Sequence, residues 1–238
     1  MLAAEAMRLA SVEALSPTAA ILAGGPFPTM ARDKVFDSQA IRYEDLIDGV
    51  DFTPSIAVYT DDSRSVRRGD GATSTIGFAS ATLTVVCDLS VGITGEGDPY
   101  ADAMATTDPV ARLVLGALCS QVKQTLVRGP TSAAFRRIVK SVDEVRIDSF
   151  ALPDMGLRWM RNTMRFSCTI ADDEFTDAAG LPQPIQRLMQ ALPAGSYAKA
   201  KLLALHAAFL ATDRDALDAI VFSTRGNPAI DGPEGSAL

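Results

Sequence analysis

Two stretches of the chain alternate between apolar and polar residues. Every second residue from Ala81 to Ile93 is apolar, and most of the positions between them carry Thr, Asp or Ser. Residues 158–170 alternate in the same way, with Phe166 among the apolar set and Thr163 among the polar set. A period of two is the spacing of a β-strand that buries one face. The pattern predicts a half-buried strand in each stretch.

Weaker signals complete the list of expected elements. Residues 55–60 follow Pro54 and read as a strand that pairs with 79–93 as a hairpin across the polar loop 61–74. A further strand is expected at 142–150. Apolar residues spaced three or four apart predict helices at 2–15, 109–128, 182–192, 196–211 and 212–223.

The order of these elements predicts an α+β fold. Consecutive strands are expected to pair into an antiparallel or mixed sheet of about four strands, and the helices are expected to cover one face of it. After residue 172 only helical patterns follow. We therefore expect an α+β domain over residues 1–172 and a helical extension with a C-terminal tail over 173–238.

Composition excludes several classes of protein. The chain has 238 residues, 47% of them hydrophobic, which is enough to build a core without disulfides. Its net charge of −7 and pI near 4.7 argue against ordinary nucleic-acid binding and against a membrane-surface protein. No apolar run reaches membrane-spanning length, and Glu5 and Glu13 interrupt the N-terminal region where a signal peptide would be apolar. We expect a protein made and kept in a cytoplasm-like compartment.

Catalytic and cofactor motifs are not evident. His206, the single histidine, lies in an apolar helical pattern and is expected to be a packed or surface residue rather than a general base. The cysteines Cys87, Cys119 and Cys168 are far apart and form no metal-binding motif. The glycines from Gly92 to 97 lack the ending of a phosphate-binding loop. The sequence therefore predicts no cofactor and no enzyme.

Acidic strand ends keep one enzymatic alternative open. Asp61-Asp62 and Asp172-Asp173-Glu174 each follow a predicted strand. If the two groups met in space, their carboxylates could hold a divalent cation, although such residues are also typical of solvated turns. A metal-dependent enzyme is therefore kept as an alternative.

Charge is unevenly distributed along the chain. Residues 131–170 carry a net charge of +3, whereas 1–60, 61–130 and 171–238 carry −4, −2 and −4. Arg161 and Arg165 are expected on the outward face of the last strand with Trp159, and Arg136-Arg137 precede this hairpin. The face is either simply solvated or docks on an acidic face of an identical subunit, as in a ring built from head-to-tail contacts.

The order of elements resembles a known family. Four segments resemble the tail-terminator proteins of long-tailed bacteriophages. They are Thr53-Pro54-Ser55-Ile56-Ala57-Val58-Tyr59-Thr60, the alternating strand 81–87, the helical segment 117–122 and the strand ending at Ile170. The resemblance covers about residues 1–172. The helical extension from 175 to 238 departs from the compact members of that family.

The resemblance implies a structural virion protein, assembled in the host cytoplasm. It implies a hexameric ring at the head-proximal end of the tail that ends tail-tube polymerisation and joins the tail to the head connector. Its partners would be other copies of the chain, the tail-tube protein and the connector, with DNA passing through the pore without specific binding and no membrane contact. The neighbouring role of a head–tail connector or neck adaptor stays open. The expected interface residues are Asp61, Asp62, Arg64, Arg67, Arg68, Arg136, Arg137, Trp159, Arg161 and Arg165.

Overall fold

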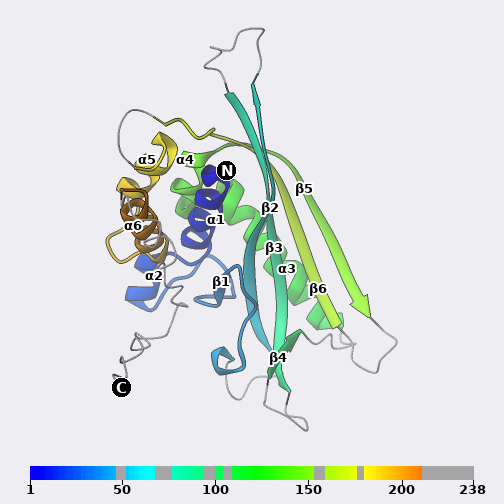
Figure 1. The fold of residues 1–238 in the computed structure, drawn as a ribbon. Coiled ribbons are helices and arrows are strands. Elements are labelled where there is room, and N and C mark those ends of the chain that lie inside the picture. The colour runs from blue at the N-terminus through cyan, green and yellow to red at the C-terminus, as the bar shows by residue number, and fades with distance from the viewer. Residues whose placement is uncertain are drawn as a thin grey trace, which may run out of the picture.

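The computed structural model describes residues 1–46, 52–67, 77–93, 100–103, 109–152, 159–175 and 180–210 (Figure 1). The α-helices are α1 (Leu2–Leu15), α2 (Thr18–Ala23), α3 (Pro109–Arg128), α4 (Phe135–Ile138), α5 (Gln183–Ala191) and α6 (Tyr197–Leu210), with 3-10 turns η1 (Tyr43–Asp45) and η2 (Pro130–Ala133). The strands are β1 (Val35–Asp37), β2 (Thr53–Arg67), β3 (Gly77–Ile93), β4 (Tyr100–Ala103), β5 (Val139–Leu152) and β6 (Trp159–Ile170).

The strands form one mixed sheet, which confirms the α+β fold class. Their order is β1-β2-β3-β6-β5, and β4 pairs with the end of β3. Only β1 and β2 are parallel, and all other neighbours are antiparallel. The expected hairpin pairing is confirmed, with Ile56 opposite Cys87 and Val58 opposite Val85. The sheet has two strands more than the sequence predicts, because β1 and β4 are too short to show a period.

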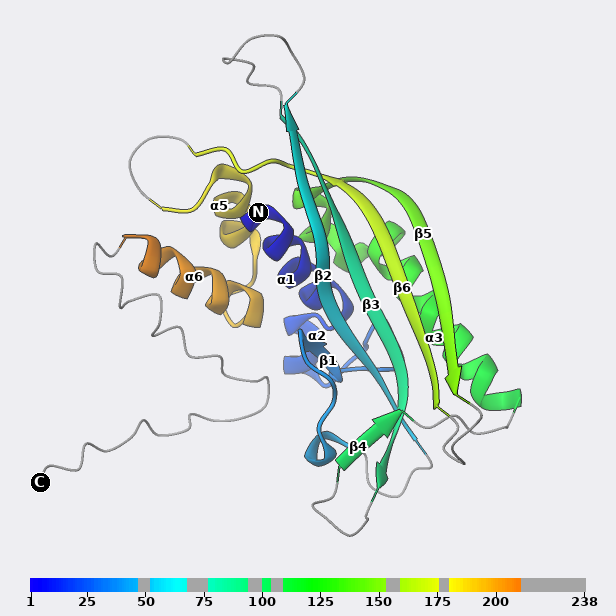
Figure 2. The same ribbon diagram turned by 45° about the vertical axis from the view of Figure 1, so that its right-hand side comes forward.

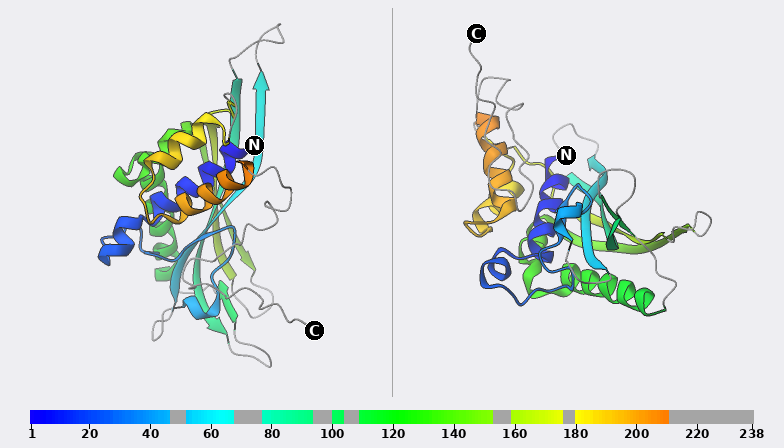
Figure 3. Two further views of the ribbon diagram at one scale, coloured as in Figure 1. Left: turned by 60° about the vertical axis from the view of Figure 1, so that its left-hand side comes forward. Right: turned by 90° about the horizontal axis from the view of Figure 1, so that it is seen from below.

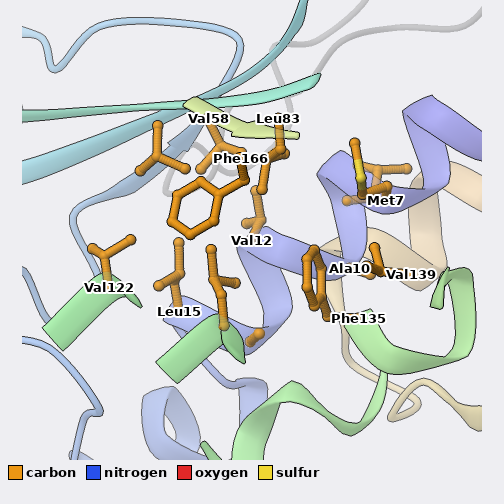
Figure 4. Packing of buried hydrophobic residues seen from close by; sticks show 14 of the residues in the cluster. Met7, Ala10, Val12, Leu15, Val58, Leu83, Val122, Phe135, Val139 and Phe166 are labelled. Atoms are coloured by element: carbon orange, nitrogen blue, oxygen red, sulfur yellow. The ribbon is translucent and has the colours of Figure 1, made fainter. Parts of the chain in front are cut away.

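One face of the sheet carries the core (Figure 4). Val58, Leu83 and Phe166, which come from β2, β3 and β6, are buried there, as the period of two predicts. Helix α3 supplies Leu115, Leu118, Val122 and Leu126 to the same cluster, all at most 1% exposed. Seen from below, α1 and α3 lie on this single side of the sheet (Figure 3, right). The other face is not covered by any helix of the described part of the chain.

Helix α1 is more deeply buried than the sequence pattern predicts. We expected a stripe at Leu2, Ala6, Leu9, Val12 and Leu15 facing the core, but most of the helix is buried around its whole circumference. One reason is that four of the nine remaining positions are alanines, whose small side chains let the sheet, α3, α4, α5 and α6 approach from several sides. Helix α1 therefore lies at the centre of the fold and contacts both the sheet and the other helices.

Helices α5 and α6 pack on α1 and share its core (Figures 1 and 2). Leu181, Ile185, Leu188 and Leu202 belong to the same cluster of buried residues as the sheet. The described part of the extension is thus packed against the first 172 residues, while the division into two domains stays a prediction. The helix predicted at 212–223 lies outside the described residues.

Polar contacts fix the helices around α1. The Glu13 carboxylate accepts hydrogen bonds from the backbone N–H and the hydroxyl of Thr18, both at 2.8 Å, and from the Ser196 hydroxyl at 2.7 Å. At the other end of α1, the Asp173 carboxylate accepts the N–H groups of Leu2 and Ala3 at 2.9 and 2.8 Å. These contacts join α1 to α2, to the start of α6 and to the segment after β6.

Candidate assembly surfaces

A bidentate ion pair lies on the face of the sheet that no described helix covers. Arg161 on β6 donates from Nε and one terminal nitrogen to both carboxylate oxygens of Asp88 on β3, at 2.8 and 3.0 Å. Asp88 is only 6% exposed, so the pair lies in a partly desolvated position where such contacts are strong. Partial burial raises the pKa of the neighbouring Tyr59, while Arg161 acts in the opposite direction and Asp88 adds to the increase.

A second cluster of charges lies further along the same face. Asp148 on β5 accepts from Arg146 at 3.0 Å and from Arg165 of the paired strand. The two arginines that were expected to make this hairpin basic, Arg161 and Arg165, are therefore each balanced by a carboxylate of an adjacent strand. Asp88 was missed as the partner of Arg161 because the two lie far apart in sequence and meet only through the β3–β6 register.

The expected residues Arg136 and Arg137 lie apart from this face. They belong to α4, next to the first residue of β5, whereas Arg161 pairs with Phe150 near the other end of that strand. Both side chains are exposed. Arg136 donates to the backbone carbonyl of Gly129 at 3.1 Å and contacts the Ser132 hydroxyl. The structure therefore does not bring these two residues together with Arg161 and Arg165.

The β2–β3 hairpin projects beyond the rest of the sheet (Figures 1 and 2). A bulge interrupts its pairing between Thr60 and Ser63, and the Asp61 carboxylate there accepts the hydroxyl of Thr84. Asp62 and Arg64 are exposed along this arm. The backbone of Arg67 pairs with Gly77 at the end of β2. Arg68 lies outside the described residues.

An open edge runs along β5. This strand of 14 residues pairs with β6 on one side, and no strand of the described ranges pairs with its other side. The backbone of Trp159, opposite Leu152, lies in the paired strand β6. A long unpaired edge offers a row of backbone donors and acceptors to an incoming strand. No sequence signal identified β5 as the edge, because strand order is set by tertiary pairing.

The acidic strand ends have separate structural partners. Asp172 accepts from the Ser65 hydroxyl at 2.6 Å, and Asp173 caps α1 as described above. Asp61 contacts Thr84 instead. Among the residues with a described position, no group of three or more His, Cys, Asp and Glu side chains is arranged to hold a metal ion.

The remaining reactive side chains are packed into the fold. Cys87 and Cys119 lie together between β3 and α3, and the hydrogen bond between them lowers the pKa of Cys119 and raises that of Cys87. Asn162 donates to the Cys119 Sγ at 3.5 Å. His206 lies against Gly180, and its Nδ1 has no hydrogen-bond partner in the described structure.

Comparisons with known proteins do not assign the chain to a family. No family model, no curated protein and no solved structure matches it. Of the helices in the described ranges, none is long and apolar enough to cross a membrane.

Proposed function

We propose that this protein is a structural ring protein of a phage or phage-like tail, which ends tube polymerisation at the head-proximal end and joins the tail to the head connector. The observation that carries the proposal is the open mixed sheet, which has a long free edge at β5 and a projecting β2–β3 arm on its other side. An edge and an arm on opposite sides of one sheet suit head-to-tail contacts between copies, which form a ring when the rotation from copy to copy closes.

The directions of the strands support this arrangement. Because β2, β3, β6 and β5 alternate in direction, β5 of one copy would run antiparallel to β2 of the next if the two sheets continued side by side. Beyond β1, which covers only residues 56–58 of β2, no described strand pairs with the outer edge of β2. Antiparallel addition of β5 would therefore use the part of β2 after residue 58, where it does not displace β1.

The size of the complex tests the proposal. We expect mass photometry and negative-stain images of the purified chain, alone and with the tail-tube protein of the same particle, to reveal rings that cap tube ends. The matched variant is Ile147→Lys, because Ile147 on β5 is 47% exposed and a charged residue on an edge strand disfavours strand addition. A chain that stays monomeric and leaves tube length unchanged contradicts the proposal.

Two alternatives give different results in the same assays. A neck adaptor would bind the connector without shortening tubes. A metal-dependent enzyme would be stabilised by Mg²⁺, Mn²⁺ or Ca²⁺ in a thermal-shift series, and the effect would disappear in an Asp61→Asn/Asp172→Asn variant.

A further inference from the structure

The helical side of the molecule carries a run of unopposed positive charge. Residues 109–142, which span α3, η2, α4 and the start of β5, contain six basic residues and no Asp or Glu. At the average acidic content of the chain, 29 residues in 238, a run of this length would hold about four carboxylates. The run therefore has a net charge of +6, and the rest of the chain has −13.

All six cations of this run are exposed. Their side chains form no ion pair with any carboxylate of the described structure. We call them the α3–α4 cationic face: Arg112, Lys123, Arg128, Arg136, Arg137 and Lys140.

The face is also hollowed and partly apolar. An open hollow of about 440 Å³ is lined by Ser120, Lys123, Gln124, Val127 and Arg128. Nearer the start of α3, Leu113 is 74% and Val110 57% exposed. Cations beside exposed aliphatic side chains suit an acidic polypeptide with apolar residues better than a phosphate backbone, which offers no apolar surface.

A segment of this chain has the matching chemistry. Residues 211–238 follow α6 and lie outside the described part; they carry five acidic and two basic residues, a net charge of −3. They also contain the apolar sequence Ile220-Val221-Phe222. Fully extended, 28 residues span up to about 90 Å, so the segment is long enough to reach α3 of its own or a neighbouring copy.

We propose that the α3–α4 cationic face binds the acidic C-terminal segment 211–238. Electrostatic attraction would guide the segment to the face, and its apolar residues would cover Val110 and Leu113. The proposal concerns which segment fills this face, and it does not depend on ring formation or on a role in a phage tail.

Binding in trans tests the proposal. Every described member of the core cluster lies between Ala3 and Leu202, so a chain ending at residue 210 keeps all of these residues. We expect a fluorescently labelled peptide of residues 211–238 to bind this shortened chain saturably. Binding should weaken about tenfold between about 50 and 500 mM NaCl, because salt screens exposed charges. The full chain should bind the peptide more weakly, since its own segment competes.

Charge reversal locates the binding surface. Lys123→Glu/Arg128→Glu should weaken peptide binding about tenfold, because each reversal replaces an attraction with a repulsion. The control Arg64→Glu/Arg146→Glu makes the same change in net charge on the sheet and should change binding less than about twofold. A peptide with Asp213, Asp215 and Asp218 replaced by Asn should bind as weakly as the reversed protein does.

Other outcomes overturn the proposal. Absence of saturable binding, or equal binding to the two double variants, excludes this face as the site. Loss of binding only in Leu203→Gln would place the segment on the exposed side of α6 instead. If the shortened chain does not fold, the full chain gives a second measurement: Lys123→Glu/Arg128→Glu should then speed proteolytic cleavage after residue 210 several-fold, and an unchanged rate contradicts the proposal.

Discussion

Replacing Glu13 should loosen the contact between α1 and the two helices that it anchors. Its side chain is 7% exposed and accepts three hydrogen bonds of 2.7–2.8 Å, two from Thr18 and one from Ser196. Hydrogen bonds to a charged group contribute about 1.5–3 kcal/mol each, and a buried donor left without an acceptor costs about 1–3 kcal/mol. These terms are not additive within one network.

Two substitutions of Glu13 distinguish how much its charge and its hydrogen bonds contribute to the free energy of unfolding. In Glu13→Gln the amide oxygen can still accept the Thr18 N–H, and the amide NH2 can donate to a hydroxyl, so we expect a loss of about 1–2 kcal/mol. In Glu13→Ala all three donors lose their acceptor and a cavity forms, so we expect a loss of about 3–5 kcal/mol. The second loss is a large fraction of the stability of a typical domain.

Urea denaturation followed by far-UV circular dichroism measures both losses. The double-mutant cycle of Glu13→Gln with Ser196→Ala should give a coupling energy of about 1 kcal/mol, because Ser196 shares the carboxylate. Hydrogen exchange should accelerate at the amides of Thr18 and Lys199, at the starts of α2 and α6, more than in β3. If Glu13→Ala costs less than about 1 kcal/mol, or if the cycle shows no coupling, the carboxylate does not hold these helices.

Three further predictions concern other buried groups. Asp88→Asn should destabilise the fold by about 1–3 kcal/mol in thermal unfolding, and Asp88→Asn/Arg161→Met should recover part of that loss; equal losses in both variants would contradict the ion-pair argument. Gly180→Ala should cost about 1–3 kcal/mol, because φ at residue 180 is +107° and the new Cβ would overlap the His206 imidazole, and His206→Ala should relieve part of the cost. Burial raises the pKa of the Cys168 thiol to about 12, so the unfolded thiol ionises first and Cys168 should lower the free energy of unfolding by about 1 kcal/mol from pH 9 to 10. The difference in this pH dependence between the original chain and Cys168→Ala measures that contribution, because Cys87 and Cys119 are present in both.

The inner face of the sheet is predictable from the sequence, because burial on one side of a strand leaves a period of two. Leu83, Val85, Met164 and Phe166 are buried as the pattern predicts. The outer face is less predictable. Asp88 was expected in solvent, yet it is buried because β3 is a central strand and its outward side chains are flanked by those of β2 and β6.

The candidate surfaces were partly predictable for the same reason. Asp62 and Arg64 were expected in a polar loop over 61–74; they are exposed but belong to β2, which continues to Arg67. Contacts between distant segments determine the strand order, the free edge of β5 and the ion pair between Arg161 and Asp88. A local sequence pattern does not predict such contacts. The six cations of 109–142 are visible in the sequence, but the run crosses residue 130, so the net charges of −2 for 61–130 and +3 for 131–170 do not reveal it.

The position of this run within the fold explains why it is informative. The buried side of α3 is fixed by packing, since Leu115, Leu118, Val122 and Leu126 fill the core. The exposed side has no such constraint, and Glu is among the best helix-forming residues for solvent-exposed positions. A helix in an acidic protein that uses Arg and Lys but no Glu on its exposed side is therefore not explained by helix formation or by core packing. The sign of the charge on this side fits the acidic segment proposed to bind there, and the salt and charge-reversal experiments measure that attraction.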